Sequence, residues 1–155
     1  MVKKEIENMR KIVNPFIETS KKCLKDLGNC ISMFFIQTKD GIMVVPFQFT
    51  NQEEKVLMLN IIKEMLERLD SDFYIFVGEA WYVKTKKTEE ISVPPSQSKK
   101  RKECLQIIYQ QRDKTSYGVI IPFERKGKTI KFGRKVEFSN LTEKSFFGKL
   151  LLFGD

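Results

Sequence analysis

The chain of 155 residues contains no histidine and only three cysteines. Without histidine it cannot build a Ser-His or Cys-His nucleophile, a histidine-ligated zinc or haem site, or a histidine pH switch. Cys23, Cys30 and Cys104 form no C-x-x-C pair, which argues against a disulfide framework and a structural zinc site. Glycine-rich dinucleotide and P-loop motifs are missing too. We therefore expect no cofactor and no metal.

Long apolar runs and a secretory signal are also missing. No run approaches the ~20 residues that cross a bilayer, and the N-terminus, Met-Val-Lys-Lys-Glu, leads into no apolar segment. We expect a cytoplasmic protein with no membrane partner. Its length fits one domain, residues 1–155, and 13 phenylalanines among 41% hydrophobic residues can fill a core.

The apolar spacing predicts an α+β fold. Helical periodicity covers 2–27, with a kink or break at Pro15, and again 50–69, opened by the capping pattern Thr50-Asn-Gln-Glu53. Asp40-Gly41 predicts a hairpin between strands at 31–38 and 42–49. Further strands are expected at 73–83, 104–111, 117–123, 129–132 and 136–138, with a short helix or tail near the C-terminus. We expect a single, mostly antiparallel sheet with the N-terminal and central helices packed on one face.

The strand from Phe73 to Val83 is apolar on both of its faces, so we expect cover on both. Its one carboxylate, Glu79, shares a face with apolar side chains and would need a cationic partner or lose its charge. Arg101 and Arg112 flank the next strand and could supply that partner. Glu79 is then a general acid/base or anchor at a cleft near Gly78, where the sheet is interrupted. Alternatively it forms a structural ion pair fixing the loop to the sheet, or ends the strand in solvent.

Positive charge gathers in the second half of the chain. Residues 1–83 hold 11 lysines and arginines against 12 acidic residues, whereas residues 84–135 hold 15 against five. Much of the excess lies in residues 85–102, a basic segment containing Pro94-Pro95 and serines, which we expect to form a mobile loop. Such a surplus attracts polyanions, nucleic acid first, but it also fits a merely solvated surface.

Asp113 and the run Glu124-Arg-Lys126 fit the D…ExK pattern of metal-dependent nucleases. There, two carboxylates hold Mg²⁺ and the lysine helps to activate water. ExK arises easily by chance in a chain that is 31% charged, and Glu53-Glu-Lys55 fits it equally. Cys104, at the start of a strand, is expected to be a buried hydrophobe and not a reactive thiol.

Glu79-Ala-Trp81, then Pro95-Ser96, then Arg101-x-Glu103 form one strand–loop–strand pattern within residues 72–110. The pattern resembles one found in a family of small prokaryotic and phage proteins without an assigned activity. The resemblance implies a polar cluster of Glu79, Trp81, Arg101 and Glu103. The run Lys99-Lys-Arg-Lys102 is more basic than the pattern requires, so the matching arginine is open.

Together these features predict a small non-enzymatic protein that binds an acidic partner, nucleic acid or another polyanion. An enzyme centred on Glu79, or a Mg²⁺-dependent nuclease using Asp113, Glu124 and Lys126, is the second reading. A structural subunit, such as a homo-oligomer with a solvated basic surface, is the third. The predicted binding residues are Trp81, Lys86, Lys87, Lys99, Lys100, Arg101, Lys102, Arg125, Lys126 and Lys128.

Overall fold

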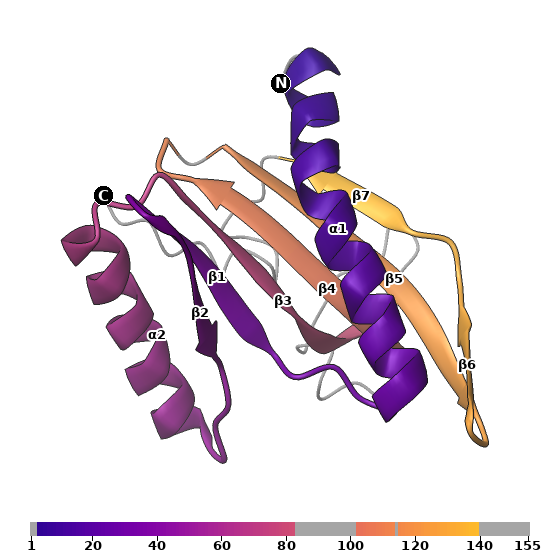
Figure 1. Cartoon of the computed structure of the whole chain (residues 1–155). Coiled ribbons are helices and arrows are strands. Elements are labelled where there is room, and N and C mark those ends of the chain that lie inside the picture. Colours follow the sequence, from indigo (N-terminus) through magenta and orange to yellow (C-terminus); the bar gives the residue numbers. More distant parts are fainter. Residues whose placement is uncertain (1–2, 83–101, 114, 140–155) are drawn as a thin grey trace, which may run out of the picture.

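The computed structural model describes residues 3–82, 102–113 and 115–139 (Figure 1). The predicted α+β fold with a mostly antiparallel sheet is confirmed. The elements in chain order are α1 (Lys3–Leu27), β1 (Met33–Thr38), β2 (Gly41–Pro46), α2 (Gln52–Arg68), β3 (Phe73–Tyr82), β4 (Lys102–Gln111), β5 (Ser116–Lys126), β6 (Thr129–Phe132) and β7 (Val136–Ser139). The expected C-terminal helix and basic loop fall on residues outside these ranges, except that Lys102, expected at the end of the loop, is the first residue of β4. Neither described helix combines the length and apolar character needed to cross a bilayer.

One antiparallel sheet of seven strands runs in the order β2-β1-β3-β4-β5-β6, with β7 also paired to β5. The predicted hairpin between β1 and β2 is confirmed, and a second hairpin joins β5 to β6. At the second tip Gly127 adopts φ 62°, a left-handed conformation that glycine tolerates best. Pro46 ends the edge strand β2, where the lack of an N–H is least costly.

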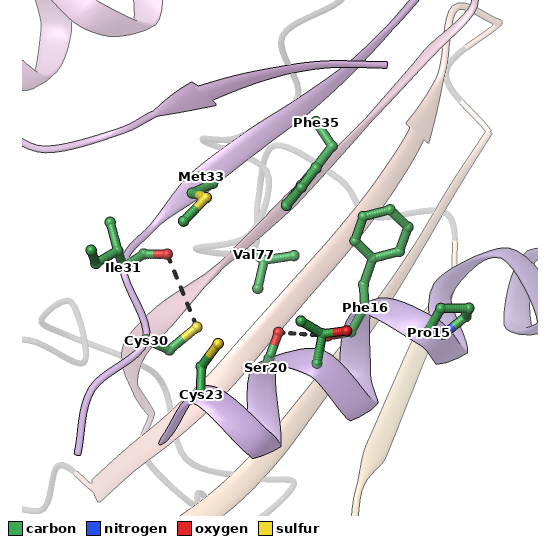
Figure 2. A pocket seen from close by; sticks show the side chains of 10 residues that line it. Pro15, Phe16, Ser20, Cys23, Cys30, Ile31, Met33, Phe35 and Val77 are labelled. Atoms are coloured by element: carbon green, nitrogen blue, oxygen red, sulfur yellow. Dashed lines mark hydrogen bonds between the residues drawn. The ribbon is translucent and has the colours of Figure 1, made fainter. Parts of the chain in front are cut away.

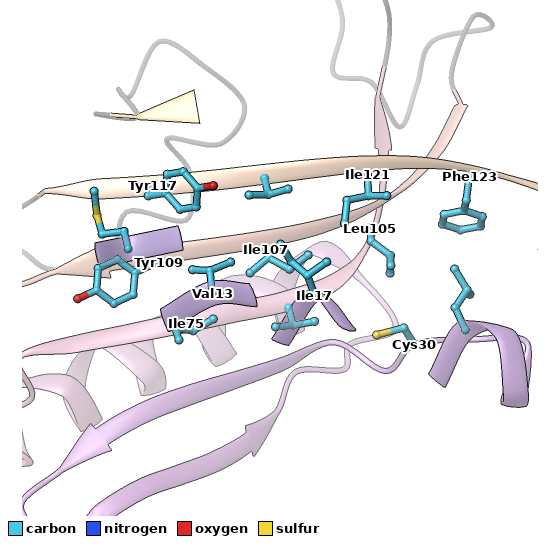
Figure 3. Close-up of a cluster of buried hydrophobic side chains, with 14 residues drawn as sticks. Val13, Ile17, Cys30, Ile75, Leu105, Ile107, Tyr109, Tyr117, Ile121 and Phe123 are labelled. Carbon is cyan, nitrogen blue, oxygen red and sulfur yellow. The ribbon is translucent and has the colours of Figure 1, made fainter. Parts of the chain in front are cut away.

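The two helices cover opposite faces of the sheet, so the expectation that both lie on one face is wrong. Val13 and Ile17 of α1 pack with Ile75 of β3 and with the odd-numbered residues of β4 and β5 (Figure 3). On the other face, α2 packs against Tyr74 and Phe76. The physical reason is the apolar character of β3 on both faces, each of which must be removed from water. The predicted cover on both faces of this strand is thereby confirmed.

The helices differ from expectation at Pro15 of α1 and at the N-terminal cap of α2. Helix α1 continues through Pro15, so the predicted break does not occur, and Pro15 lies on the exposed side of the helix, where a missing backbone hydrogen bond costs least. The cap of α2 is shifted by one residue, because Asn51 accepts the Glu54 N–H at 2.9 Å while the Glu54 carboxylate accepts the Thr50 N–H at 2.8 Å. Three apolar side chains of α2, those of Val56, Leu57 and Ile61, are exposed.

Candidate functional site at the basic end of the sheet

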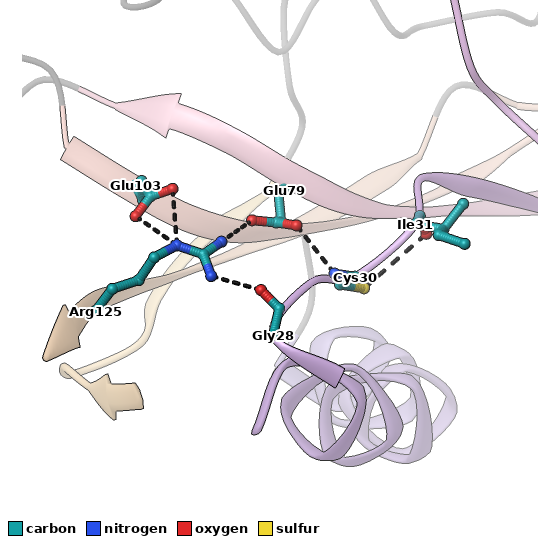
Figure 4. Close-up of polar contacts among 6 residues, drawn as sticks. All are labelled: Gly28, Cys30, Ile31, Glu79, Glu103 and Arg125. Atoms are coloured by element: carbon teal, nitrogen blue, oxygen red, sulfur yellow. Dashed lines mark hydrogen bonds and ion pairs between the residues drawn. The ribbon is translucent and has the colours of Figure 1, made fainter. Parts of the chain in front are cut away.

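Glu79 lies on the α1 face of β3, near the end of the strand, and both of its carboxylate oxygens are engaged (Figure 4). Oε1 accepts a hydrogen bond from Nη2 of Arg125 at 2.7 Å. Oε2 accepts the backbone N–H of Cys30 at 2.9 Å. Glu79 therefore joins β3 to β5 and to the connection between α1 and β1.

Arg125 completes this arrangement from β5. Its Nε donates to the Glu103 carboxylate of β4, at 3.1 Å to Oε2, and its Nη1 donates to the carbonyl oxygen of Gly28 (Figure 4). Gly28 adopts φ 79° and its N–H bonds the Leu24 carbonyl at 3.0 Å, so it ends α1 as a left-handed cap. A cation is favourable beside the carboxyl end of a helix. We call Arg125, Glu79, Glu103, Gly28 and Cys30 the Arg125 hub.

The hub corrects the predicted partner of Glu79, which is Arg125 and not Arg112. Arg112 instead pairs with Asp70 at 2.9 Å and donates to the Ser71 carbonyl. It directly follows β4 and therefore lies at the opposite end of the β3–β4 pair from Glu79. Arg101 lies outside the described residues. Of the readings for Glu79, the geometry favours a structural ion pair, with the α1–β1 connection as the segment that it fixes to the sheet.

The strand is also not interrupted at Gly78, as the cleft interpretation required. β3 pairs with β4 without a break from Phe73 to Tyr82. What ends near Gly78 is the pairing of β3 with β1, which extends only to Val77. Gly78 is needed for a close approach instead: a Cβ there would lie 3.1 Å from Cβ of Ser32 and closer still to its hydroxyl oxygen. The predicted interruption of the sheet is therefore only the end of the β1–β3 pairing, and β3 itself continues.

The residues of the nuclease hypothesis are not brought together. Asp113 lies in the turn before β5, where its carboxylate accepts the Thr115 N–H at 2.9 Å. Glu124 and Lys126 lie near the other end of β5, which puts them more than about 25 Å from Asp113 along the strand. One Mg²⁺ ion cannot be held by both carboxylates. Among the described residues, no group of three metal-ligating side chains is found.

Two of the three cysteines, Cys30 and Cys104, are not placed for nucleophilic chemistry. Cys104 is 1% exposed, and burial raises the pKa of its thiol to about 12. Cys30 is also buried, and desolvation raises the pKa of its thiol to about 11. The expectation that Cys104 is a buried hydrophobe is confirmed.

Cys23 and Cys30 face an apolar groove of about 210 Å³ between α1 and β1 (Figure 2). Phe16, Met33 and Phe35 also line it. At its floor the Ser20 hydroxyl donates to the Phe16 carbonyl at 2.6 Å, which leaves the groove few polar groups for a ligand. It can hold an apolar group and provides no charge.

Basic residues gather at the end of the sheet where α1 ends and the β5–β6 hairpin turns, on both faces of the sheet. The ammonium groups of Lys21 and Lys25 each lie 5.4 Å from the ring centre of Phe132 on β6, which ties the last turns of α1 to the hairpin (Figure 1). The hairpin adds further lysines at 126, 128 and 131. We call these five lysines, together with Lys102, the basic end.

The segment 83–101 is attached to the chain at the same end of the sheet. Its described neighbours, Tyr82 and Lys102, are paired across β3 and β4. The register from Cys104↔Pro122 onward puts Lys102 beside the last part of β5. In sequence, the segment brings six lysines and arginines against two glutamates.

Only some of the predicted binding residues lie at the basic end. Lys102, Lys126 and Lys128 belong to the basic end, and Trp81 is 41% exposed beside it. Arg125 is committed to the hub. Lys21 and Lys25 were missed because they lie in the electrically neutral half of the chain, although their i, i+4 spacing marks one helix face. The remaining predicted residues, Lys86, Lys87, Lys99, Lys100 and Arg101, lie outside the described ranges.

The fold and site define a small α+β protein in which an arginine hub anchors the N-terminal helix to one antiparallel sheet beside a lysine-rich end. The chain belongs to the family of bacteriophage lambda protein ea47, whose model matches residues 1–154. The resemblance to a phage protein family is confirmed at this level, while the Glu-Ala-Trp pattern stays a prediction. Searches of curated proteins and of solved structures each gave no match.

Proposed function

We propose that the protein is a non-enzymatic binding protein whose basic end holds a polyanion, with nucleic acid as the first candidate. The observation that carries the proposal is the convergence of three basic elements at one end of the sheet. These are the last turns of α1, the β5–β6 hairpin and the attachment points of the segment 83–101. Lysines gathered at one end of a protein release counterions when they bind a phosphate backbone, which makes association favourable and dependent on salt.

The few ion pairs made by the lysines of the β5–β6 hairpin support this proposal. Lys128 and Lys131 make no ion pair with any acidic residue that the structure describes, and Lys126 approaches Glu124 only at 4.0 Å. Lysine also suits this role chemically, because its ammonium is a point charge on a long stem that follows an irregular phosphate backbone. Arg125 differs, since its donors are used by Glu79, Glu103 and Gly28.

An enzyme centred on Glu79 is the less supported alternative. Both oxygens of this carboxylate already accept hydrogen bonds from the chain itself, whereas a general base must reach a proton of its substrate. The proposal includes a cytoplasmic location, where the protein meets nucleic acid.

The test compares two triple variants with the same change of charge. K21A/K25A/K128A removes cations from the basic end, and K3A/K4A/K11A removes three exposed lysines from the first half of α1, roughly 30 Å away for Lys4 and Lys25. Anisotropy of a labelled oligonucleotide of about 20 residues is measured between about 50 and 200 mM salt.

We expect the basic-end variant to bind more weakly and to lower the slope of log K against log salt by about 2. The distal variant should stay near the wild type. Thermal melting of both variants checks that Phe132, which contacts two of the lysines, is still packed. Equal losses in both variants, or no binding by the wild type at the lowest salt, would refute the proposal.

A further inference from the structure

The only tryptophan of the chain, Trp81, lies where the sheet meets the basic end. It is the second-last residue of β3 and stands opposite Glu103 of β4. Since successive side chains alternate, it shares a face with Glu79 and therefore with the Arg125 hub. Helix α1, which covers this face elsewhere, ends at Leu27 beside the hub, and Trp81 keeps 41% of its surface exposed.

Trp81 begins a row of side chains that crosses four strands toward the lysines. Glu103 is its partner on β4, and continuing the β4–β5 register by one residue puts Phe123 next on β5. Phe123 pairs with Phe132 on β6, over which Lys21 and Lys25 lie. With neighbouring strands spaced by about 4.8 Å, the row spans about 14 Å.

The inner part of this row is held by contacts within the chain. Arg125 lies over the Phe123 ring at 5.3 Å and holds the Glu103 carboxylate, and Phe123 itself is buried. The row therefore has a partly exposed aromatic side chain, Trp81, at one end and ammonium groups at the other. An indole is a wide, stiff surface with two rotatable bonds, so little entropy is lost when a flat partner covers it.

We infer that Trp81 stacks on an unpaired base, and that the ligand of the basic end is single-stranded nucleic acid. This inference rests on the proposed function and adds the class of ligand. The lysines take the phosphates, as they would in any nucleic acid, but only a single strand exposes the face of a base to an aromatic side chain. In a duplex those faces are covered by neighbouring base pairs, and Trp81 would gain nothing.

Because the chain has one tryptophan, its fluorescence reports on this position alone. The wild-type protein is titrated with a single-stranded oligonucleotide and with a duplex of the same sequence. We expect quenching of Trp81 emission by the single strand and little change with the duplex. Anisotropy of the labelled oligonucleotides then gives both affinities for the wild type and for the variants.

Two substitutions separate stacking from general damage. Trp81→Leu removes the aromatic surface and should weaken single-strand binding roughly 10- to 100-fold while changing duplex binding little. Trp81→Phe should retain part of the affinity. Phe49→Leu is the matched control, because Phe49 is an aromatic side chain of similar exposure, 42%, before α2. It should bind like the wild type, and thermal melting confirms that each variant is folded.

The outcomes distinguish the two proposals. Unquenched emission in the bound complex, or equal loss of single-strand and duplex binding in Trp81→Leu, would overturn the stacking inference. The binding proposal would survive that result if K21A/K25A/K128A still weakened binding more than its distal control. Absence of binding to either nucleic acid would remove both proposals.

Discussion

Replacing Arg125 by methionine is expected to loosen the attachment of α1 to the sheet. Methionine keeps much of the apolar stem but removes the donors to Glu79, Glu103 and Gly28. Two carboxylates from adjacent strands would then lie near each other without the cation between them. The free energy of unfolding should fall measurably, because removing one member of an ion pair leaves its partners without compensation.

The magnitude follows from how far the hub is shielded from water. A hydrogen bond to a charged group contributes about 1.5–3 kcal/mol when buried, and an exposed ion pair contributes about 0–1 kcal/mol. The side chains of Arg125, Glu79 and Glu103 are 37%, 27% and 31% exposed, which is between these limits. We expect a loss of about 2 kcal/mol. For a chain of this length, that lowers Tm by about 4 to 8 °C.

Urea unfolding followed by circular dichroism measures the loss, and a second arginine gives the control. Arg68 pairs with Glu64 on the exposed side of α2, with side chains 77% and 58% exposed. Arg68→Met should therefore cost no more than about 0.5 kcal/mol. In a cycle with Glu79→Gln, the Arg125 pair should show a coupling of at least about 1 kcal/mol.

A loss in Arg125→Met no greater than that in Arg68→Met would refute the reasoning, as would a coupling near zero with Glu79. The first result would mean that the hub is screened like a surface pair. The second would mean that Arg125 acts through Glu103 or Gly28, and that Glu79 is held by the Cys30 N–H alone.

Three further predictions concern other parts of the chain. Gly78→Ala should destabilise the protein by about 1–3 kcal/mol through overlap with Ser32, and Ser32→Ala in that background should recover part of the loss in urea unfolding. A thiol reagent at pH 8 should label Cys23 in the folded protein and all three cysteines after unfolding, because burial raises the pKa of the other two thiols; rapid labelling of three thiols in the folded state would contradict this. The hydrogen bond from Arg10 lowers the pKa of Glu137, so this pair stabilises the fold above the ordinary carboxyl pKa and loses its effect as the pH falls through the lowered value. Glu137→Gln should accordingly be less stable than the wild type at pH 7 and equal to it in acid; a difference that persists in acid would reject the assignment.

Local signals in the sequence predict the parts of the fold that short-range chemistry decides. The turn at Asp40-Gly41 is confirmed because two apolar strands flank a dipeptide suited to a hairpin. The cover on both faces of β3 follows from its alternation, since both sets of side chains are apolar. In each case the deciding residues lie within a few positions of one another.

The errors concern contacts between residues that are distant in the chain. Helical periodicity shows which side of α1 is apolar but not which face of the sheet it meets, so the opposite placement of the two helices was missed. The sequence predicts a partner for Glu79 among the arginines that flank the next strand, whereas its partner lies 46 residues away on β5. That contact depends on the strand order, in which β4 lies between β3 and β5. The strand order cannot be derived from the amino-acid composition.

The contacts divide the positive charge of the second half of the chain into two groups with different roles. Arg112 and Arg125 each use a planar fork of donors to bind a carboxylate and a backbone carbonyl of the chain itself. The lysines of the β5–β6 hairpin form no comparable network among the described residues. Counting charge alone gives both groups equal weight as binding residues. Their contacts instead predict that substitution of the arginines changes stability, whereas substitution of the lysines changes affinity and its dependence on salt. Measuring both properties on Arg125→Met and K126A/K128A/K131A tests this division, because a binding arginine would lose affinity in a protein that remains fully folded.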